Sequence, residues 1–467
     1  MTAPLLLLLA AAAAAEWSQF RGPNAGGVSP DTGLPVEFGP HRSVVWKTPL
    51  PFGASSPVLA GDRIFLTGSQ GGQLLTFALD RATGRILWRR EIAAAREEPL
   101  NKLNNRASST PVTDGANVYV FFGDFGLASY GPDGEERWKL PLGPFTNLHG
   151  MAASPVLAGG KLLMICDQNV DSYLMALDPR DGRVLWKTPR PEVTHGFSTP
   201  IVHRPPSGPA QLIVPGSYQL IAYSIEDGRK LWWVRGTTWQ VKSAPVIGGG
   251  VLYFNGWAPG GDPGEQLDLP PFSEVVARYD ANKDGKMARD ELPKPYGPTG
   301  SWEAIDLDRD GLLNERDWIF FSARRAARNS TIAVRLGGSG DVTATHLLWR
   351  YGKSLPDVAC PLLYRDALYL VRTGGILTTL KPATGEVLKQ GRLTGALDGY
   401  YSSPVGADGK VYIASQNGKV LVLKAAGEWD VLAINDFDEE CYATPAIAGG
   451  RIYLRTRSAL YCFAGKP

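Results

Sequence analysis

The sequence has few of the residues that build redox, zinc and haem sites. Its 467 residues include only four cysteines and five histidines, and no CxxC or CxxCH motif occurs. A zinc triad and a nucleophile elbow are also missing, so the common metal and hydrolase signatures do not apply. The spacing of the cysteines leaves two alternatives open, disulfides or buried free thiols. They stand at Cys166, Cys360, Cys441 and Cys462.

Charge of one sign and long apolar runs are lacking as well. The formal net charge is +2 and no basic run is present, so we expect no nucleic-acid partner. The apolar part of the opening stretch MTAPLLLLLAAAAAAEW is too short to span a bilayer and ends in the small residues Ala13, Ala14 and Ala15. It predicts a signal peptide over residues 1–15, although no Lys or Arg precedes the leucines; an apolar anchor is the alternative. We expect an exported protein, periplasmic or secreted, without a transmembrane segment in the mature chain.

Glycine and proline are abundant instead, and many of the prolines belong to a repeat. The 54 glycines and 36 prolines are spread along the chain, which favours many turns. A Ser-x-Pro-Val element followed by a glycine turn and a β-branched run recurs eight times, at a spacing of about 45 residues with one gap roughly 70 residues too long. This period is typical of a propeller blade. The repeat prolines are Pro57, Pro111, Pro155, Pro200, Pro245, Pro361, Pro404 and Pro445.

A second motif closes most units. ALDRATGRILW ends at Trp88 and ALDPRDGRVLW ends at Trp186. The glycines Gly84 and Gly182 suit a hairpin turn with positive φ, and the alternating residues around them predict strands with one buried face. Each unit should therefore hold four antiparallel strands, from the inner strand at the axis to the outer strand.

The ends of the chain complete the prediction. The last unit has room for only three strands, and Ser43–Thr48, which carries Trp46, supplies the missing outer strand. The predicted fold class is all-β: an eight-bladed β-propeller closed by an N-terminal strand. The predicted divisions are an N-terminal segment at 16–42, blades at 43–257, an insertion at 258–329 and the remaining blades at 330–467.

The tryptophan motif and the stretch WSQFRGPNAGG, which begins at Trp17, resemble the PQQ-like (pyrroloquinoline quinone-type) β-propeller repeat family. The resemblance covers nearly all of the predicted mature chain and implies the propeller fold. It implies less about function, because the family contains quinoprotein dehydrogenases and also non-enzymatic members such as an outer-membrane assembly lipoprotein.

The insertion contains two sequences typical of calcium loops, DANKDGKMARDEL from Asp280 and DLDRDGLLNERDW from Asp306. They predict a small α-helical EF-hand pair in blade five that binds two calcium ions, with Met287 and Leu313 joined by a short β-bridge and a helix at Glu315–Arg328. Asp317 replaces the usual glutamate, so we expect modest affinity, about 10⁻⁴ to 10⁻³ M. The candidate ligands are Asp280, Asn282, Asp284, the Lys286 carbonyl and Glu291 in loop one, and Asp306, Asp308, Asp310, the Leu312 carbonyl, Asn314 and Asp317 in loop two.

The insertion should lie between the second and third strands of its blade. Strand direction then places it on the face where outer strands lead into the next inner strands. The axial funnel of such propellers is on that face, so we expect the insertion to cap the funnel mouth.

The loops around this funnel carry polar and aromatic residues, which together predict a binding pocket, although each residue alone is compatible with packing between blades. The candidate binding residues are Arg106, His149, His195, Trp239, Lys242 and Tyr401.

The predicted function is that of an exported calcium-binding scaffold that holds a protein partner or a small polar ligand at the funnel. One alternative is a quinoprotein dehydrogenase. The sequence has no adjacent cysteines of the kind these enzymes place beside their quinone, so the quinone is not expected to bind. A second alternative is recognition of a sugar or another small polar ligand. No catalytic residue is assigned.

Overall fold

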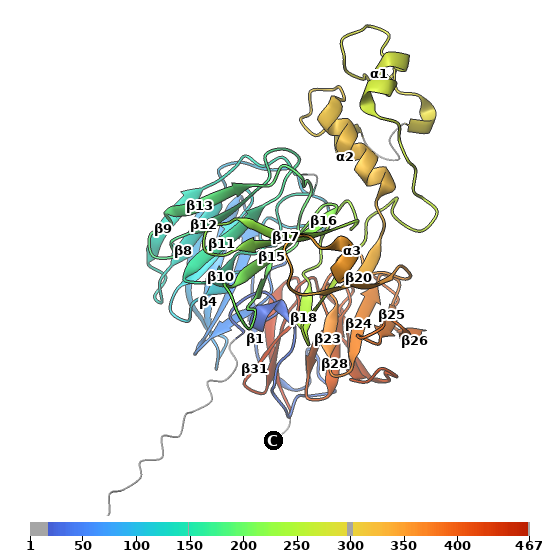
Figure 1. Cartoon of the computed structure of the whole chain (residues 1–467). Coiled ribbons are helices and arrows are strands. Elements are labelled where there is room, and N and C mark those ends of the chain that lie inside the picture. The colour runs from blue at the N-terminus through green and yellow to red at the C-terminus, as the bar shows by residue number, and fades with distance from the viewer. Residues whose placement is uncertain (1–16, 148, 297–301, 466–467) are drawn as a thin grey trace, which may run out of the picture.

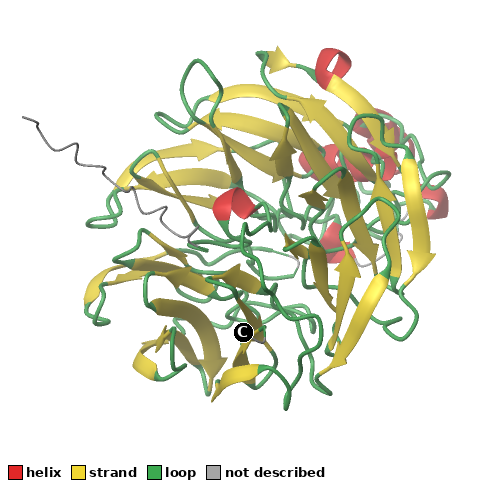
Figure 2. Ribbon diagram, turned by 90° about the horizontal axis from the view of Figure 1, so that it is seen from below, coloured by secondary structure: helices red, strands yellow, loops and turns green. Residues whose placement is uncertain are grey.

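The computed structural model describes residues 17–147, 149–296 and 302–465. These residues form eight sheets arranged around a central axis (Figures 1 and 2). The predicted eight-bladed propeller is confirmed. The predicted signal peptide, residues 1–15, lies outside the described residues.

Each blade has four antiparallel strands, and the fourth has a short additional strand, β21 (Gly340–Asp341), that pairs in parallel with β17. The strands of blades one to four are β2 (Val58–Ala60), β3 (Arg63–Gln70), β4 (Gln73–Asp80), β5 (Ile86–Ala93), β6 (Val112–Thr113), β7 (Val118–Phe122), β8 (Gly126–Tyr130), β9 (Glu136–Pro141), β10 (Val156–Ala158), β11 (Lys161–Cys166), β12 (Tyr173–Leu177), β13 (Val184–Pro189), β14 (Ile201–His203), β15 (Gln211–Gly216), β16 (Gln219–Ser224) and β17 (Lys230–Arg235).

The second half of the disc repeats this pattern, and its last blade takes one strand from near the N-terminus. The strands of blades five to eight are β18 (Val246–Gly248), β19 (Val251–Gly256), β20 (Ser330–Arg335), β22 (Leu347–Tyr351), β23 (Leu362–Tyr364), β24 (Ala367–Arg372), β25 (Ile376–Leu380), β26 (Val387–Arg392), β27 (Val405–Ala407), β28 (Lys410–Ala414), β29 (Lys419–Lys424), β30 (Val431–Asp436), β31 (Ala446–Ala448), β32 (Arg451–Arg455), β33 (Ala459–Ala464) and β1 (Val44–Pro49).

The tryptophan motif joins neighbouring blades at five of the eight junctions, through Trp46, Trp88, Trp138, Trp186 and Trp349. The indole Nε1 of Trp88 donates to the carbonyl of Pro132 at 2.9 Å, and its ring lies against Gly134. Gly134 has φ 78°, and a Cβ atom built there would lie 2.7 Å from the Trp88 ring. The glycine therefore serves both the hairpin turn and the close approach of the neighbouring tryptophan.

The closing strand β1 pairs with β33, with Thr48 opposite Leu460. Trp46 repeats the interblade contact, since its Nε1 donates to the Arg81 carbonyl of blade one at 3.2 Å. The predicted closure is therefore confirmed.

Residues 17–29 lie along the inner strands and occupy the axis. The Leu59 N–H donates to the carbonyl of Trp17 at 2.9 Å, and the Asn24 side chain exchanges two hydrogen bonds of 2.8 Å with the Val202 backbone. At the far side, the Ser29 N–H donates to the Gly406 carbonyl at 2.9 Å. The segment thus links blades one, four and seven across the centre of the disc. It includes the 3-10 helix η1 (Pro23–Ala25).

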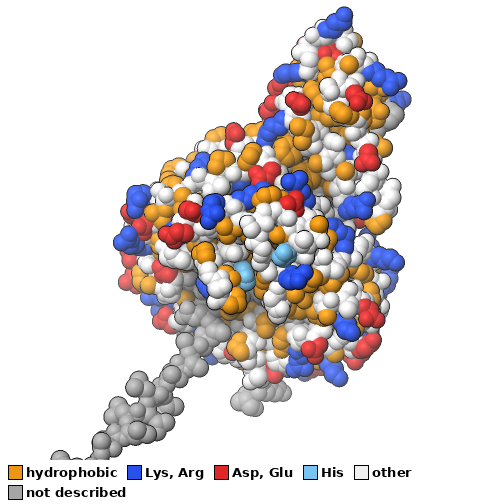
Figure 3. All heavy atoms as spheres, in the orientation of Figure 1, with side chains coloured by type: hydrophobic (Ala, Val, Ile, Leu, Met, Phe, Trp, Pro, Cys, Tyr) orange, Lys and Arg blue, Asp and Glu red, His pale blue; other side chains and the backbone are white. Residues whose placement is uncertain are grey.

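The insertion, residues 258–329, stands between β19 and β20 of blade five, as predicted, and projects from the disc (Figures 1 and 3). The predicted bridge between Met287 and Leu313 is present, and Trp318 belongs to a separate apolar core within the insertion. The predicted helix 315–328 ends at Ala326. The helices are α1 (Phe272–Tyr279), η2 (Lys294–Tyr296), η3 (Trp302–Ala304) and α2 (Glu315–Ala326), with α3 (Thr343–His346) outside the insertion.

Within the described residues, no helix combines the length and the apolar character that crossing a membrane requires.

Candidate functional site

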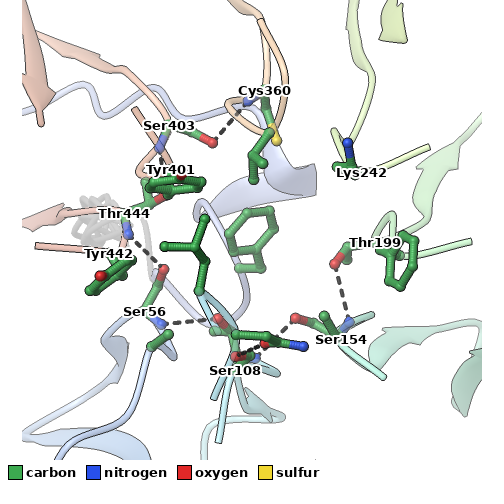
Figure 4. A pocket seen from close by; sticks show the side chains of 18 of the residues that line it. Ser56, Ser108, Ser154, Thr199, Lys242, Cys360, Tyr401, Ser403, Tyr442 and Thr444 are labelled. Atoms are coloured by element: carbon green, nitrogen blue, oxygen red, sulfur yellow. Dashed lines mark hydrogen bonds between the residues drawn. The ribbon is translucent and has the colours of Figure 1, made fainter. Parts of the chain in front are cut away.

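A pocket of about 290 Å³ opens at the axis, on the face where outer strands lead into inner strands (Figure 4). Its apolar lining includes Phe20 from the axial segment, Leu103 from the loop before β6 and Phe197 from the loop before β14. The other lining residues come from the loops that lead into the inner strands. All eight blades therefore contribute to the pocket. A concave site of this size suits a small ligand or the end of a chain.

A ring of hydrogen bonds surrounds the pocket. Except at Thr199, the residue before each repeat proline donates its N–H to the side chain of the equivalent residue in the next blade, as from Ser154 to Thr199 Oγ1 at 3.1 Å. Ala244 donates to Cys360 Sγ at 3.1 Å, and Thr444 closes the circle by donating to Ser56 Oγ at 3.1 Å. We call the six hydroxyl residues the hydroxyl ring: Ser56, Thr110, Ser154, Thr199, Ser403 and Thr444.

The sequence contains a signal for this ring, which the repeat motif alone did not reveal. The residue before the repeat proline is Ser or Thr in six units, with Ala244 and Cys360 as the two departures. We interpreted Ser-x-Pro-Val as a turn and strand signal and gave the x position no role. The side chain at that position joins neighbouring blades and faces the pocket.

A lysine–aspartate pair and two tyrosines line the pocket, and Lys242 lies across from Tyr401 and Tyr442 (Figure 4). Lys242 Nζ is 2.5 Å from Asp357 Oδ1. The rings of Tyr401 and Tyr442 pack with centroids 5.8 Å apart. Burial, and then the charge of Asp357, raises the pKa of Tyr401, which is therefore a neutral donor and acceptor at neutral pH.

Three of the six predicted binding residues line this pocket, namely His149, Lys242 and Tyr401. His149 stacks on Phe197 with ring centroids 5.6 Å apart. Arg106 lies outside the pocket lining and pairs with the buried Asp124 and with Glu97.

The other two, His195 and Trp239, lie beneath the insertion. Trp239 is 3% exposed, its Nε1 donates to the Pro259 carbonyl at 3.0 Å, and the Arg324 guanidinium lies 3.9 Å from its ring centroid. His195 is 2% exposed with its ring edge toward Trp239. Burial, reinforced by the charge of Arg324, lowers the pKa of His195 to about 3. These residues lie at the junction between the insertion and blade four and outside the lining of the axial pocket.

The insertion rests on the rim of the disc instead of covering the funnel mouth. Its α2 contacts blade four through the Tyr218 hydroxyl, which donates to the Phe320 carbonyl at 3.0 Å. No residue of the insertion is among the described residues that line the axial pocket. The expected cap over this pocket is therefore not observed, and the insertion contacts Trp239 in the loop before β18 instead.

Backbone N–H groups donate hydrogen bonds to the carboxylates of loop one of the insertion. Asp280 accepts from the N–H groups of Lys283 at 2.7 Å and Gly285 at 2.9 Å. Glu291 accepts from Ala281 at 3.0 Å and from Ala288 at 2.9 Å. Gly285 has φ 78°, which supplies the sharp turn expected at this position.

Loop two gathers three carboxylates. One oxygen from each of Asp306, Asp308 and Asp317 lies within 4.8 Å of the others. Oδ1 of Asp306 is buried and has no hydrogen-bond partner among the described residues. Burial, followed by the charges of Asp308 and Asp306, raises the pKa of Asp317 to about 6. Lys286 of loop one pairs with Asp310 at 2.6 Å.

The four cysteines are free and buried. Of the two alternatives that the sequence left open, the structure therefore shows the buried thiols. Cys360 alone lines the pocket.

Comparisons with known proteins agree with this fold. A family model described as "Outer membrane protein assembly factor BamB" matches residues 40–170 and 170–466. A BamB from Yersinia pestis is 24% identical over 84% of this chain and 91% of its own length. A polyvinylalcohol dehydrogenase from a Pseudomonas species is 27% identical over 34% of this chain, and the match spans only 26% of that enzyme. For a Burkholderia pseudomallei BamB, 26% identical over 32% of this chain, the match spans 35% of the relative.

Solved structures of both kinds share the propeller. The structure of BamB from Moraxella catarrhalis superposes with a TM-score of 0.57 over 90% of this chain and 99% of its own, at 12% identity. A europium-containing methanol dehydrogenase gives a TM-score of 0.62 over 96% of this chain and 98% of its own, at 9% identity. At such identities the likeness shows the fold alone.

Proposed function

The chain belongs to the family of the outer membrane protein assembly factor BamB, and on that premise we propose that it is an exported scaffold of the cell envelope that holds a protein partner at the pocket face. The match to the Yersinia pestis BamB, over 84% of this chain and 91% of that protein, supports this reading. The match to the polyvinylalcohol dehydrogenase involves about a quarter of that enzyme.

The environment of Trp239 favours the scaffold function over that of a quinoprotein dehydrogenase. Such a dehydrogenase holds its quinone between a tryptophan and a disulfide of adjacent cysteines. Trp239 is 3% exposed, and Arg324 lies on its ring. The cysteines are free and distant in sequence, so no adjacent pair flanks a quinone here. The residues present do not fit the quinone.

A photo-crosslinking amino acid at Leu103 tests the scaffold function. Leu103 lies at the pocket mouth, and Asp133 lies in a turn between a third and an outer strand, on the opposite face of the disc. We expect envelope proteins to crosslink to the Leu103 position in a defined pattern and not to the Asp133 position. Equal crosslinking at the two positions, or none at Leu103, would contradict a partner site at this face.

The alternative activity has its own test. Reconstitution with pyrroloquinoline quinone and calcium in a dye-linked alcohol or aldose oxidation assay should give no turnover. Quinone-dependent turnover would make the dehydrogenase reading the leading one.

We also propose that the two loops of the insertion bind calcium. Oxygen ligands from carboxylates, an amide and backbone carbonyls are what calcium prefers, and each loop presents them at the expected spacing. The buried, unpartnered Oδ1 of Asp306 and the clustered carboxylates of loop two support the proposal. A bound cation would offset their mutual repulsion and order the insertion.

A further inference from the structure

The hydroxyl ring presents unused donors. Each of its six oxygens accepts one N–H bond from the preceding blade and, among the described residues, donates to no protein acceptor. A buried hydroxyl has one hydrogen to give, and leaving it unpaired costs free energy. The pocket floor therefore offers several hydrogen-bond donors to the oxygen atoms of a ligand.

A buried cation lies next to this ring. Arg21 is 0% exposed, and its Nη2 donates to the carbonyls of Pro361 at 2.9 Å and Pro404 at 3.3 Å, the residues that follow Cys360 and Ser403. Its Nε and Nη1 have no hydrogen-bond partner, and the described residues place no carboxylate beside it. Arg21 interacts with the Cys360 thiol, which lines the pocket.

A buried guanidinium without a counter-ion is unfavourable, because burial favours charges that are paired. The remaining charges of the pocket do not provide an anion, since Lys242 and Asp357 neutralise each other. Arg21, which is buried beside the lining but is not part of it, thus adds a positive charge next to the unsatisfied donors of the ring, and both are complementary to anionic oxygen.

The rest of the lining is apolar or aromatic. Leu103, Phe197 and Val358 belong to this lining, and the Tyr401–Tyr442 pair lies across from Lys242 (Figure 4). Contact between this surface and an apolar or aromatic group would make binding more favourable. The surface would contribute little to the binding of a fully hydrated ion.

We propose that the axial pocket binds a carboxylate attached to an apolar or aromatic body. Two sources share this chemistry, a free organic acid and the C-terminal residue of a protein chain. The second source rests on the proposed scaffold function, and the first is independent of it. The carboxylate accepts from the hydroxyl ring beside Arg21, while the body packs on Tyr401 and Tyr442.

Calorimetric titration of the purified full chain at neutral pH tests the charge requirement, with N-acetyl-phenylalanine and its uncharged amide as probes. The acid should bind at least about tenfold more tightly than the amide, since hydrogen bonds to a charged group are stronger than those to a neutral one. Lys242→Gln, which leaves Asp357 facing the anion, should weaken the acid about tenfold, and Asp357→Asn should strengthen it. Neither should change the affinity for the amide.

Lys139→Gln is the matched control, because Lys139 pairs with Glu136 on the outer strand β9, away from the pocket. It should leave acid binding unchanged. The proposal would be overturned if the acid and the amide bound with equal affinity. It would also be overturned if neither Lys242→Gln nor Asp357→Asn changed the affinity for the acid. Tighter binding of a neutral disaccharide than of the acid would overturn it as well.

A hexapeptide ending in phenylalanine, with a free or an amidated C-terminus, separates the two sources. Binding of the free-ended peptide at least as tightly as the small acid identifies a chain end. Binding of the small acid alone identifies a free organic acid, and supports the pocket chemistry even if no protein partner is crosslinked at Leu103.

Discussion

The side chain of the residue before the repeat proline provides a hydrogen-bond acceptor for a backbone N–H of the neighbouring blade. Proline has no N–H and restricts the preceding residue to extended conformations, so the inner strand begins with a polar N–H that its own sheet leaves unpaired. A hydroxyl in the next blade accepts this N–H, as between Ser403 and Thr444 Oγ1 at 3.0 Å. Ser and Thr at this position therefore join the blades and leave one hydrogen for a ligand.

Completing the ring should stabilise the protein. Ala244 has no hydroxyl, so the bond that Thr199 would donate at this position cannot form. Ala244→Ser should raise the free energy of unfolding by about 1 kcal/mol, the usual net value of a hydrogen bond. Ser154→Ala should lower it by about 1–3 kcal/mol, because the Thr110 N–H loses its acceptor. Urea unfolding measures both, and a destabilised Ala244→Ser variant would contradict the argument.

His195 should make the protein less stable in acid. Its ordinary pKa is about 6.5, and the folded protein lowers it to about 3 through burial and the charges of Arg324, His149 and Arg309. Above pH 6.5 the ring is neutral whether the chain is folded or unfolded, so no effect is expected. Below that value the unfolded chain binds a proton that the folded chain excludes, which costs up to about 1.4 kcal/mol per pH unit.

The measurement is the stability of the His195→Asn variant relative to the parent between pH 4 and 8. Asparagine tolerates the positive φ of 34° at this position. The variant should lose stability less steeply than the parent below pH 6.5, whereas His346→Asn in the surface helix α3 should follow the parent. Parallel curves for His195→Asn and the parent would contradict the assignment.

The sequence predicted part of the pocket at this scale and missed the rest for physical reasons. His149, Lys242 and Tyr401 were recognised because loop position in a repeat fixes their face. Trp239 and His195 have equivalent loop positions, but the insertion covers them, and no repeat pattern predicts where an insertion docks. Arg21 was missed because the axial position of its segment depends on bonds to three distant blades.

At the scale of elements, the insertion joins a helical module to a β scaffold through few contacts. Helix α2 begins with a capping box in which Asn314 accepts from the N–H groups of Arg316 and Asp317, and Asp317 accepts from the Asn314 N–H. Asp317 is therefore a helix-capping residue as well as a proposed calcium ligand. The same helix carries Phe320 and Arg324 to the junction with blade four. The proposed metal binding and the docking of the insertion would thus be coupled through one helix.

Calcium should order the insertion without being needed by the blades. Glu291→Ala with Asp317→Ala should abolish calcium uptake at about 10⁻⁴ to 10⁻³ M and change the fluorescence of Trp318, which lies in the core of the insertion. The β-sheet circular dichroism should stay intact, since the blades have their own cores. Calorimetry with calcium measures uptake.

Asp290→Asn is the matched control for this experiment. Asp290 lies inside loop one but outside the predicted ligand set, so its replacement should leave calcium uptake nearly unchanged. Loss of the whole fold in one transition on chelation, or no uptake at millimolar calcium, would rule out a separately ordered, metal-supported insertion.

The boundaries of this element were predictable where local chemistry sets them. The Met287–Leu313 bridge follows from the matching loop positions, and it is present with hydrogen bonds of 3.0 and 2.9 Å. The end of α2 at Ala326 was missed by two residues, because Asn329 is used by the blade instead. Its side chain bonds to Thr238 and to both backbone groups of Ala258 at 2.8–2.9 Å.

For the whole molecule, one repeated contact explains why the number of blades was predictable. Five tryptophans reach the turn of the following blade, as Trp138 donates to the Pro179 carbonyl at 3.0 Å and lies against Gly182. The spacing of the motif therefore reveals the order of these blades. Trp46 makes the same contact with blade one, whereas Trp232 donates to Gln211 of its own blade and Leu388 lies against Gly427 in place of a tryptophan.

Removal of residues 43–49 should open this ring. The edge of β33 would lose the partner that covers residues Ala459 to Phe463, and an unpaired edge promotes intermolecular association. We expect aggregation in size-exclusion chromatography with light scattering and a lower melting temperature. Trp138→Ala is the comparison, because it removes an interblade contact of the same kind but leaves every strand paired. It should lower the melting temperature while the protein stays monomeric. A shortened chain that remained monomeric with unchanged melting would show that β1 does not close the propeller.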